Sequence, residues 1–348
     1  MKAVQVLRHG RPTDVISVND VAVPDVGPGE VRVAVSAASL NFGDVARALG
    51  GVTTVMLQPP FTLGMDVCGV VEAAAAGGER WLGRRVVGMT KMALGGMAEK
   101  AVVPLTSLFD APPELNDAEA AAFLLPFHVS YLGLHVRGHL KAGETVLVSA
   151  AASGVGTAAV QLSAAAGAQV IALAGGSEKG AYCKKLGATA SIDHQQENLF
   201  DRVMELTAGR GVDVAFDLVG GELTEPLWTC MALEGRYLPV GFNGDVQSGF
   251  TGKPLRKVSI GNFSVLGVML AYGRAVGPMR RLGMNLYSPE IGAKVHAELC
   301  ELVAQGKIRP AIGRRILMGE VAAALEDHAA RRTSGRTVVD IAGIAEKC

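Results

Sequence analysis

Apolar and polar positions follow a strand-like pattern in the first part of the chain. Short apolar, β-branched runs at 3–7, 30–37 and 67–73 are separated by turn-forming sequences that include Gly27-Pro28-Gly29 and Gly77-Gly78. Runs of this kind between Gly and Pro clusters favour β-strands, and several short strands in succession pack as a barrel. We therefore expect an all-β, barrel-like region at the start of the chain.

A helical pattern takes over at residue 117, where Asp117 is expected to cap a helical region that extends to Leu134. Strands and helices then alternate, which is the order of βαβ units and of a parallel sheet. The elements predicted after this point are a strand beginning at 146, a helix at 157–166, strands at 169–174 and 212–218, helices at 289–305 and 321–331, and a strand at 337–341.

This order of elements predicts two domains. The 348 residues, 49% of them hydrophobic, are enough to form a core in each domain. The β-rich domain is expected to comprise residues 1–124 and 269–348. A doubly wound nucleotide-binding domain is expected between them, at residues 125–268.

A run of small residues follows the strand at 146 and indicates a phosphate-binding turn. Residues 146–156 read Val-Leu-Val-Ser-Ala-Ala-Ala-Ser-Gly-Val-Gly. Backbone N–H groups at the start of a helix bind a pyrophosphate when no bulky side chain intervenes. Ala151 and Ser153 occupy the first two glycine positions of the usual G-x-G-x-x-G motif, and Gly156 occupies the third. An ordinary tight turn is the alternative, but the βαβ context favours a dinucleotide.

The end of the second strand of this fold indicates which dinucleotide is bound. An acidic residue about 20 positions after the glycines would bind the ribose 2′-hydroxyl of NAD, and none stands there. The chain instead reads Ala174-Gly175-Gly176-Ser177-Glu178-Lys179. Ser177 can donate a hydrogen bond to a 2′-phosphate and Lys179 can neutralise it, which favours NADPH. Glu178 argues the other way, and a solvated helix start is the alternative for both charges.

Charge and cysteine content narrow the class of protein. The 33 basic and 33 acidic residues give a formal net charge of zero, which offers no reason to expect nucleic acid or an anionic membrane as partner. The chain begins as a strand without a signal-peptide pattern, so a cytoplasmic location is expected. Its five cysteines are scattered and never spaced as C-x-x-C, so we expect reduced, structural thiols and no zinc lobe.

Several motifs in one order resemble the zinc-independent quinone oxidoreductase (zeta-crystallin-like) branch of the medium-chain dehydrogenase/reductase superfamily. The resemblance spans nearly the whole chain. It implies an α/β fold, with a GroES-like β-barrel catalytic domain and a doubly wound Rossmann domain. The segments that carry it are Asn41-Phe42-Gly43-Asp44, residues 61–69, 150–156, 184–188, 211–221 and 235–241, and Gly335-Arg336.

The zinc enzymes of the superfamily differ from this chain at the metal ligands. They carry a cysteine where this chain has Asn41, and Gly-His-Glu where it has Gly64-Met65-Asp66. An amide and a thioether beside one carboxylate do not form a tetrahedral zinc site, so no metal is expected. Oxidation of an alcohol through a metal alkoxide is therefore disfavoured.

The resemblance also implies roles for individual residues. Asn41 would face substrate and nicotinamide, its NH₂ donating to a carbonyl oxygen, with Asp44 bracing the turn and Tyr131 as a further donor. The residues expected to bind the cofactor are Ser153, Gly154, Val155 and Gly156 at the pyrophosphate, Ser177 and Lys179 at the adenosine phosphate, His194 at the adenine, Gly241, Phe242 and Asn243 at the ribose and nicotinamide, and Arg336 closing the phosphate site. The strand at 264–271 resembles the edge through which family members form homodimers.

Three functions are compatible with this set of residues. The first is NADPH-dependent, metal-independent hydride transfer to a small-molecule quinone or an α,β-unsaturated carbonyl, where hydrogen-bond donors suffice for the charge on oxygen. The second is reduction of an enoyl thioester. The third is a non-catalytic NADPH-binding or structural role, as in proteins resembling lens crystallins.

Overall fold

The computed structural model describes residues 1–51, 57–241, 255–273, 277–281 and 283–343. The chain divides into two compact units. Unit 1 comprises Met1–Leu125, Ala271–Ala304 and Arg309–Cys348, and unit 2 comprises Pro126–Leu270 and Gln305–Ile308. In the part of the chain that is described, no helix has both the length and the apolar character needed to cross a bilayer.

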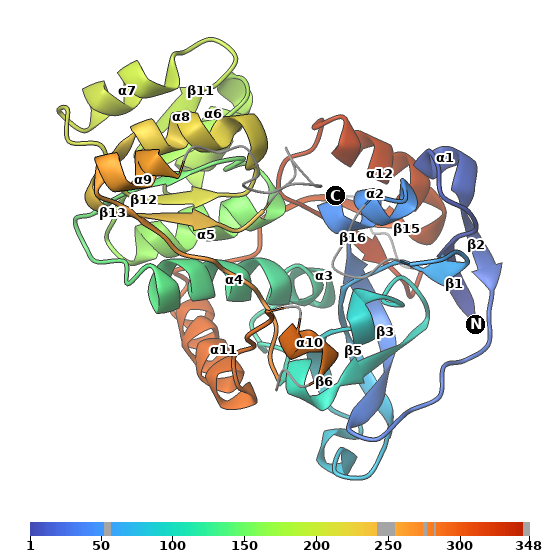
Figure 1. Ribbon diagram of the computed structural model, residues 1–348. Helices are drawn as coiled ribbons and strands as arrows, with labels where there is room; N and C mark the ends of the chain where they lie inside the picture. Colours follow the sequence, from blue (N-terminus) through green and yellow to red (C-terminus); the bar gives the residue numbers. More distant parts are fainter. Residues whose placement is uncertain (52–56, 242–254, 274–276, 282, 344–348) are drawn as a thin grey trace. The chain divides into compact units, whose positions relative to one another are not determined.

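Unit 1 is built from β-strands in two sheets (Figure 1). The seven-stranded sheet has the order β15-β16-β3-β5-β6-β8, with β7 also paired to β3, and the three-stranded sheet has the order β2-β1-β4. The strands are β1 (Lys2–Val6), β2 (Ile16–Asp20), β3 (Glu30–Ser39), β4 (Phe61–Thr62), β5 (Asp66–Ala74), β6 (Arg85–Met89), β7 (Lys100–Pro104), β8 (Leu108–Asp110), β15 (Ile312–Leu317) and β16 (Arg336–Asp340). The helices are α1 (Pro12–Val15), α2 (Phe42–Ala48), α3 (Asp117–Ala121), α10 (Pro278–Arg281), α11 (Pro289–Ala304) and α12 (Val321–Ala329).

The long strands β3 and β5 lie in the middle of this sheet, and their apolar side chains contribute to the core of unit 1. Val33, Val67 and Val71 are nearly fully buried in the core of unit 1. Gly69 sits where β5 crosses β3 most closely, since a Cβ there would lie 2.1 Å from the carbonyl oxygen of Ala34. Only glycine permits this approach of the two backbones.

Unit 2 is a six-stranded parallel sheet of order β11-β10-β9-β12-β13-β14 (Figure 1). This is the strand order of a doubly wound sheet. Successive strands are added toward one edge from β9 and toward the other edge from β12, and all strands stay parallel. The strands are β9 (Thr145–Val148), β10 (Gln169–Ala174), β11 (Ala190–Asp193), β12 (Val212–Asp217), β13 (Met231–Pro239) and β14 (Ser264–Val265). The helices are α4 (Leu124–Tyr131), which spans the boundary between the units, a π-helix at Leu132–Arg137, α5 (Gly154–Ala165), α6 (Ser177–Lys185), α7 (Leu199–Leu206), α8 (Thr224–Thr229) and α9 (Arg256–Gly261).

Two sequence predictions need correction. The cap of α3 is Asn116 rather than Asp117, because Asn116 Oδ1 accepts from the N–H of Glu119 at 3.0 Å while Asp117 is already the first helical residue. The predicted strand at 264–271 is paired only over Ser264–Val265. It is nevertheless the outermost strand of its sheet.

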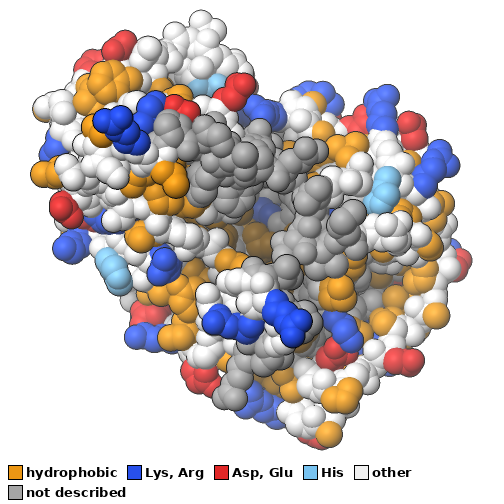
Figure 2. Space-filling view, viewed as in Figure 1, with side chains coloured by type: hydrophobic (Ala, Val, Ile, Leu, Met, Phe, Trp, Pro, Cys, Tyr) orange, Lys and Arg blue, Asp and Glu red, His pale blue; other side chains and the backbone are white. Residues whose placement is uncertain are grey.

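Charged side chains of both signs are scattered over the face shown in Figure 2. This distribution agrees with the equal numbers of basic and acidic residues. The thiols of Cys68, Cys183 and Cys230 are buried and unpaired by disulfides. Burial raises the pKa of Cys68 to about 12, which makes it an unreactive packing residue.

Candidate active site

The predicted phosphate-binding turn lies between β9 and α5 in unit 2. All four residues of β9 are buried, and the chain leaves the strand through Ala150, whose φ is 45°. Ser153 caps α5, its Oγ accepting from the N–H of Gly156 at 3.1 Å.

Gly156 is required by packing at this turn. A Cβ at Gly156 would lie 2.3 Å from the carbonyl oxygen of Ala150 and 2.7 Å from that of Ala151. Both contacts are to backbone, which cannot rotate away. Glycine at the third motif position thus lets the helix start close against the strand end, and the small residues at the first two positions leave the turn open.

Whether a pyrophosphate fits here depends on the backbone N–H groups of Gly154 and Val155. Neither donates to an acceptor within the described ranges, whereas the N–H of Thr157 already bonds Ser153 and that of Gly156 bonds the cap. Two adjacent unsatisfied donors at the positive end of a helix suit an anion. The residues present therefore fit the phosphates of a dinucleotide.

The predicted adenosine end lies where β10 runs into α6. Gly176 has a φ of 84° and is followed by exposed Ser177, the first residue of α6, with Lys179 two residues further along. The ring nitrogen Nε2 of His194 lies close against Gly175, 3.1 Å from where a Cβ would be. The structure thus brings Ser177, Lys179 and His194 to one end of the sheet.

Asp193, which the sequence analysis missed, lies at the same end. The backbone N–H groups of Gly176 and Gln195 donate to its carboxylate, and these bonds hold the pKa of Asp193 below its ordinary value. Asp193 therefore tethers the turn before Ser177. Asp193 lies 17 residues after Gly176 in the chain, so no short-range sequence pattern indicates this contact.

A buried carboxylate joins two loops beside the phosphate turn. Asp217, at the end of β12 and with no exposed surface, accepts hydrogen bonds from Ser149 Oγ and Tyr237 OH, both at 2.6 Å. The N–H groups of Val219 and Gly220 also donate to it, at 2.9 and 3.1 Å. Burial, and then the Asp217 charge, raise the pKa of Tyr237, so its hydroxyl stays protonated. Asp217 thus fixes the strand ends of β9, β12 and β13 to one another.

The loop after β13 begins at Gly241, where a Cβ would lie 2.4 Å from the carbonyl oxygen of Leu218. The N–H of Gly241 bonds the carbonyl of Asp217 at 3.1 Å. Phe242 and Asn243, predicted at the ribose and nicotinamide, lie outside the described residues.

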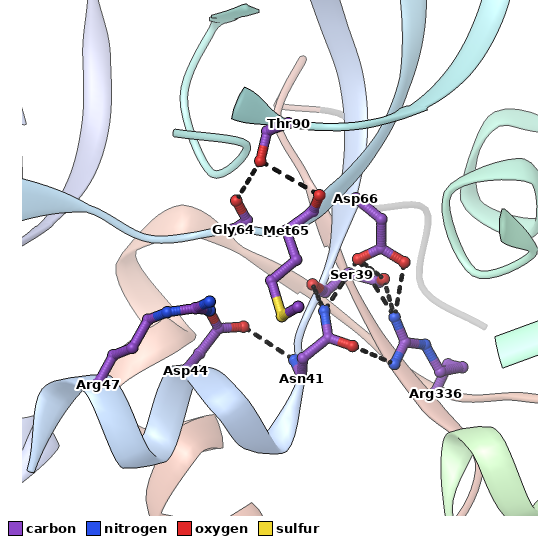
Figure 3. Close-up of polar contacts among 9 residues, drawn as sticks. All are labelled: Ser39, Asn41, Asp44, Arg47, Gly64, Met65, Asp66, Thr90 and Arg336. Carbon is purple, nitrogen blue, oxygen red and sulfur yellow. Dashed lines mark hydrogen bonds and ion pairs between the residues drawn. The ribbon is translucent and has the colours of Figure 1, made fainter. Parts of the chain in front are cut away.

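A buried polar cluster occupies unit 1 at the end of β3 (Figure 3). Asn41 Nδ2 donates to Asp66 Oδ1 at 2.9 Å and to the carbonyl of Ser39 at 3.2 Å, and Asn41 Oδ1 accepts from Arg336 Nη1 at 2.9 Å. Arg336 Nη2 pairs with Asp66 Oδ2 at 3.0 Å and also donates to Ser39 Oγ. Ser39 Oγ in turn donates to Asp66 Oδ1 at 2.9 Å.

The cluster changes the interpretation of two predicted site residues. Arg336, predicted to close the phosphate site, is 4% exposed, and both its Nη atoms contact Asn41, Asp66 and Ser39. Its buried Nε finds no acceptor in the part of the chain that the structure describes. Asn41, predicted to donate to a carbonyl oxygen, has both N–H groups directed at acceptors within the protein.

Burial and ion pairing act against each other in this cluster. Burial raises the pKa of Asp66, and the charge of Arg336 with the hydrogen bonds from Asn41 and Ser39 opposes that rise. Burial likewise lowers the pKa of Arg336, and the charge of Asp66 opposes that fall. The three donors around the Asp66 carboxylate, one of them the Arg336 cation, favour its ionised form, so Asp66 and Arg336 form a charged pair.

Asp44 braces the turn that carries Asn41, as the sequence analysis expected. Its Oδ2 accepts from the backbone N–H of Asn41 at 2.9 Å, and Arg47 Nη1 lies 3.4 Å from its Oδ1. Burial raises the pKa of Asp44, with Arg47 opposing the rise. Thr90 Oγ1 holds the neighbouring segment by donating to the carbonyl oxygens of Gly64 and Met65 (Figure 3).

Tyr131 lies at the end of α4 in unit 2. It is partly buried, and its ring contacts that of His135, with centroids 4.5 Å apart. Burial lowers the pKa of His135, so the imidazole is neutral at pH 7. The π-helix begins directly after Tyr131, and single π-turns of this kind are frequent at functional sites.

The donor set near Asn41 does not suit a metal. Met65 and Asn41 offer a thioether and an amide, and the carboxylate of Asp66 is already paired with Arg336. Across the ranges that the structure describes, no group of three or more His, Cys, Asp or Glu side chains is placed to hold an ion.

Comparison with known proteins agrees with this architecture. Residues 27–113 match the family model of the alcohol dehydrogenase GroES-like domain, and residues 154–281 match that of the zinc-binding dehydrogenases. A quinone oxidoreductase from Pseudomonas aeruginosa is 33% identical over 339 residues, covering 97% of this chain and 99% of the relative. The chain belongs to the quinone oxidoreductase branch of the medium-chain dehydrogenase/reductase superfamily.

Other members of this branch and superfamily are also similar. A quinone oxidoreductase-like protein 2 homologue from Nematostella vectensis is 31% identical over 343 residues, which are 97% of this chain and 88% of the relative. The crystal structure of the Thermus thermophilus quinone oxidoreductase, solved also in complex with NADPH, superposes with a TM-score of 0.75 at 30% identity, covering 98% of this chain and 100% of that one. A structure described as an NAD-dependent alcohol dehydrogenase gives 0.79 at 30% identity, over 98% and 99% of the two chains.

Part of the chain is similar to much larger enzymes. A mycocerosic acid synthase-like polyketide synthase from Mycobacterium tuberculosis is 35% identical over 216 residues, which are 62% of this chain and 10% of that protein. The quinone oxidoreductase relatives, which match nearly the whole chain, identify it as an oxidoreductase of this superfamily.

Proposed function

We propose that this quinone oxidoreductase-branch protein reduces a quinone or an α,β-unsaturated carbonyl with NADPH and without a bound metal. The observation that carries the proposal is the pair of binding features in unit 2. The unsatisfied N–H groups of Gly154 and Val155 suit a pyrophosphate, and Ser177 and Lys179 at the end of β10 suit an additional phosphate.

The choice of NADPH over NADH is argued from the residues after β10. The N–H of Gly176 donates to Asp193 and so engages that carboxylate within the turn, while the exposed Ser177 and the Lys179 cation stand at the helix start. The crystallised NADPH complex of the similar Thermus enzyme supports the same choice.

The bound nicotinamide supplies a hydride, and the protein supplies position and charge stabilisation. Gly154, Val155 and the capped start of α5 hold the phosphates. Asp217 keeps the strand ends around that turn in register. In unit 1, Asn41 lies in a buried, charged cluster, where its amide contacts Asp66 and Arg336. Reduction of a conjugated carbonyl then needs hydrogen-bond donors for the developing oxygen charge, and Tyr131 is the donor we propose for it.

Reduction of an enoyl thioester is the second candidate. The polyketide synthase match over 216 residues supports it, because enoyl reduction uses the same hydride step on a thioester. The assay below distinguishes the two.

We also propose that the protein forms homodimers through unit 2. β14 is the outermost strand of the six-stranded sheet, and an exposed strand edge tends to pair with another strand.

The first prediction concerns turnover itself. We expect oxidation of NADPH in the presence of naphthoquinones, cyclic enones or 2-alkenals, faster than with crotonyl-CoA and faster than with NADH. Asn41→Ala is expected to lower kcat on the order of 10- to 100-fold, because the cluster loses the residue at its centre. Asn19→Ala is the matched control, since this asparagine also hydrogen-bonds side chains in unit 1 but lies in β2.

The outcome of this assay separates the candidates. Crotonyl-CoA reduction as the fastest reaction would replace the quinone assignment by enoyl reduction. No turnover with any acceptor would leave the protein as a cofactor-binding protein and refute the proposal.

The second prediction concerns the cofactor phosphate. Lys179→Ala is expected to weaken NADPH binding by about 1–3 kcal/mol through the lost charge-assisted contact, and to leave NADH binding unchanged. Titration of cofactor fluorescence measures both affinities. Lys184→Ala is the control, because Lys184 carries the same charge in the last turn of the same helix. An equal loss for NADH would contradict the phosphate assignment.

A further inference from the structure

The orientation of the Asn41 amide follows from its neighbours. A guanidinium can only donate hydrogen bonds, so the amide atom that faces Arg336 Nη1 at 2.9 Å must be Oδ1. The atom that faces Asp66 Oδ1 at 2.9 Å must then be Nδ2, which also donates to the Ser39 carbonyl at 3.2 Å. Turning the amide over would bring its N–H groups against the Arg336 N–H, and its oxygen against the Asp66 carboxylate and the Ser39 carbonyl, replacing three favourable contacts by three unfavourable ones.

The amide is consequently left with one free hydrogen-bonding position. Both protons of Nδ2 are used, whereas Oδ1 accepts a single bond from Arg336 and keeps its second lone pair. The surroundings prevent an exchange of roles, because Asp66 has no exposed surface and Arg336 is 4% exposed. Breaking either contact would leave a buried charge without its partner.

We propose that Asp66 and Arg336 are positioning residues that lock Asn41 as a hydrogen-bond acceptor toward its ligand. The ligand group that suits it is an O–H or an amide N–H, such as the hydroxyl of a reduced quinone or the carboxamide of the nicotinamide, and not a carbonyl oxygen. The part of this inference that concerns the ligand rests on the proposed function. The lock itself depends only on the contacts within unit 1.

The lock predicts how the Asn41 side chain behaves in the protein alone. In protein labelled with ¹⁵N-asparagine, the Nδ2 protons of Asn41 are expected to exchange with solvent at least about 10-fold more slowly than those of Asn19, which is only partly buried. Asn41→Ala assigns the resonance by its disappearance. Fast exchange in the wild-type protein would overturn the proposal, whatever the enzyme reduces.

Variants then test the positioning role. Arg336→Lys and Asp66→Asn each remove a contact that orients the amide, and each is expected to speed exchange at Asn41 about 10-fold or more. Arg315→Lys is the matched control, because Arg315 pairs with Asp340 at 3.0 and 3.1 Å on the neighbouring strand without contacting Asn41. Unchanged Asn41 exchange in both folded variants would refute the lock, and the wild-type measurement decides if neither variant folds.

Ligand addition separates acceptor from donor and identifies the source. If Asn41 accepts, its Nδ2 protons stay protected when NADPH, and then a naphthohydroquinone, is added. A further chemical-shift change of that group with NADPH alone assigns the donor to the cofactor, and a change only with hydroquinone assigns it to the substrate. If the Nδ2 protons lose their protection because they now donate hydrogen bonds to the ligand, the acceptor role is overturned. In kinetics, the lock predicts that Arg336→Lys lowers kcat about 10-fold with a much smaller change in the quinone KM.

Discussion

Replacing Asp217 by alanine is expected to destabilise unit 2 by about 3–5 kcal/mol, the largest effect predicted for a side chain of this protein. Four donors converge on this buried carboxylate: Ser149 Oγ, Tyr237 OH and the N–H groups of Val219 and Gly220. Alanine removes the acceptor that these four donors share in a buried site. Cofactor affinity is expected to fall as well, because Ser149 directly precedes the phosphate turn.

Urea unfolding followed by tryptophan fluorescence measures the free energy of unfolding of unit 2. The chain has two tryptophans, Trp81 in unit 1 and Trp228 in unit 2. In a Trp81→Phe background the signal reports on unit 2 alone, where Trp228 packs edge-to-face on Tyr237. Tyr237→Phe is the graded companion, expected to cost about 1 kcal/mol because it removes one donor and leaves the carboxylate three. Equal losses for the two variants would show that Asp217 acts only through Tyr237.

Gly156→Ala is expected to lower the stability of unit 2 by about 2–4 kcal/mol and to weaken NADPH binding more than about 10-fold. The added methyl group would lie 2.3 Å from the carbonyl oxygen of Ala150, so α5 must shift away from β9. The same shift moves the N–H groups of Gly154 and Val155, which are proposed to hold the pyrophosphate.

The same unfolding assay and a cofactor titration test this prediction. Gly319→Ala serves as control, because a Cβ there meets nothing within 4 Å and the residue lies in no predicted site. The control is expected to keep both the urea midpoint and the NADPH affinity of the parent. Wild-type affinity in a stable Gly156→Ala protein would mean that the cofactor does not use the start of α5.

Short-range patterns account for much of the fold. The strand predicted at 169–174 has those bounds in β10, and the helices predicted at 289–305 and 321–331 appear as α11 (Pro289–Ala304) and α12 (Val321–Ala329). These elements are determined by the spacing of apolar residues within one segment. The predicted phosphate turn depends on the same kind of short-range pattern, because its small residues and Gly156 lie within eleven positions of one another.

Local competition explains where prediction of the elements was wrong. Asn116 and Asp117 are both good caps, and the helix begins one residue earlier than it would with Asp117 as its cap. The apolar run at 264–271 suits a strand by composition, yet only Ser264–Val265 finds a neighbour in β13. Strand pairing depends on the partner, which the run itself does not contain.

The sequence by itself determined the superfamily, the order of elements and the small residues on which a dinucleotide turn depends, because each is recorded in neighbouring positions. Only the tertiary structure decided what Asn41 can do. Its partners Asp66 and Arg336 lie 25 and 295 positions away, and no periodicity connects them. The strands β3, β5 and β16 bring these groups together in a buried site. Because a guanidinium can only donate hydrogen bonds and a carboxylate can only accept them, the amide has one orientation there.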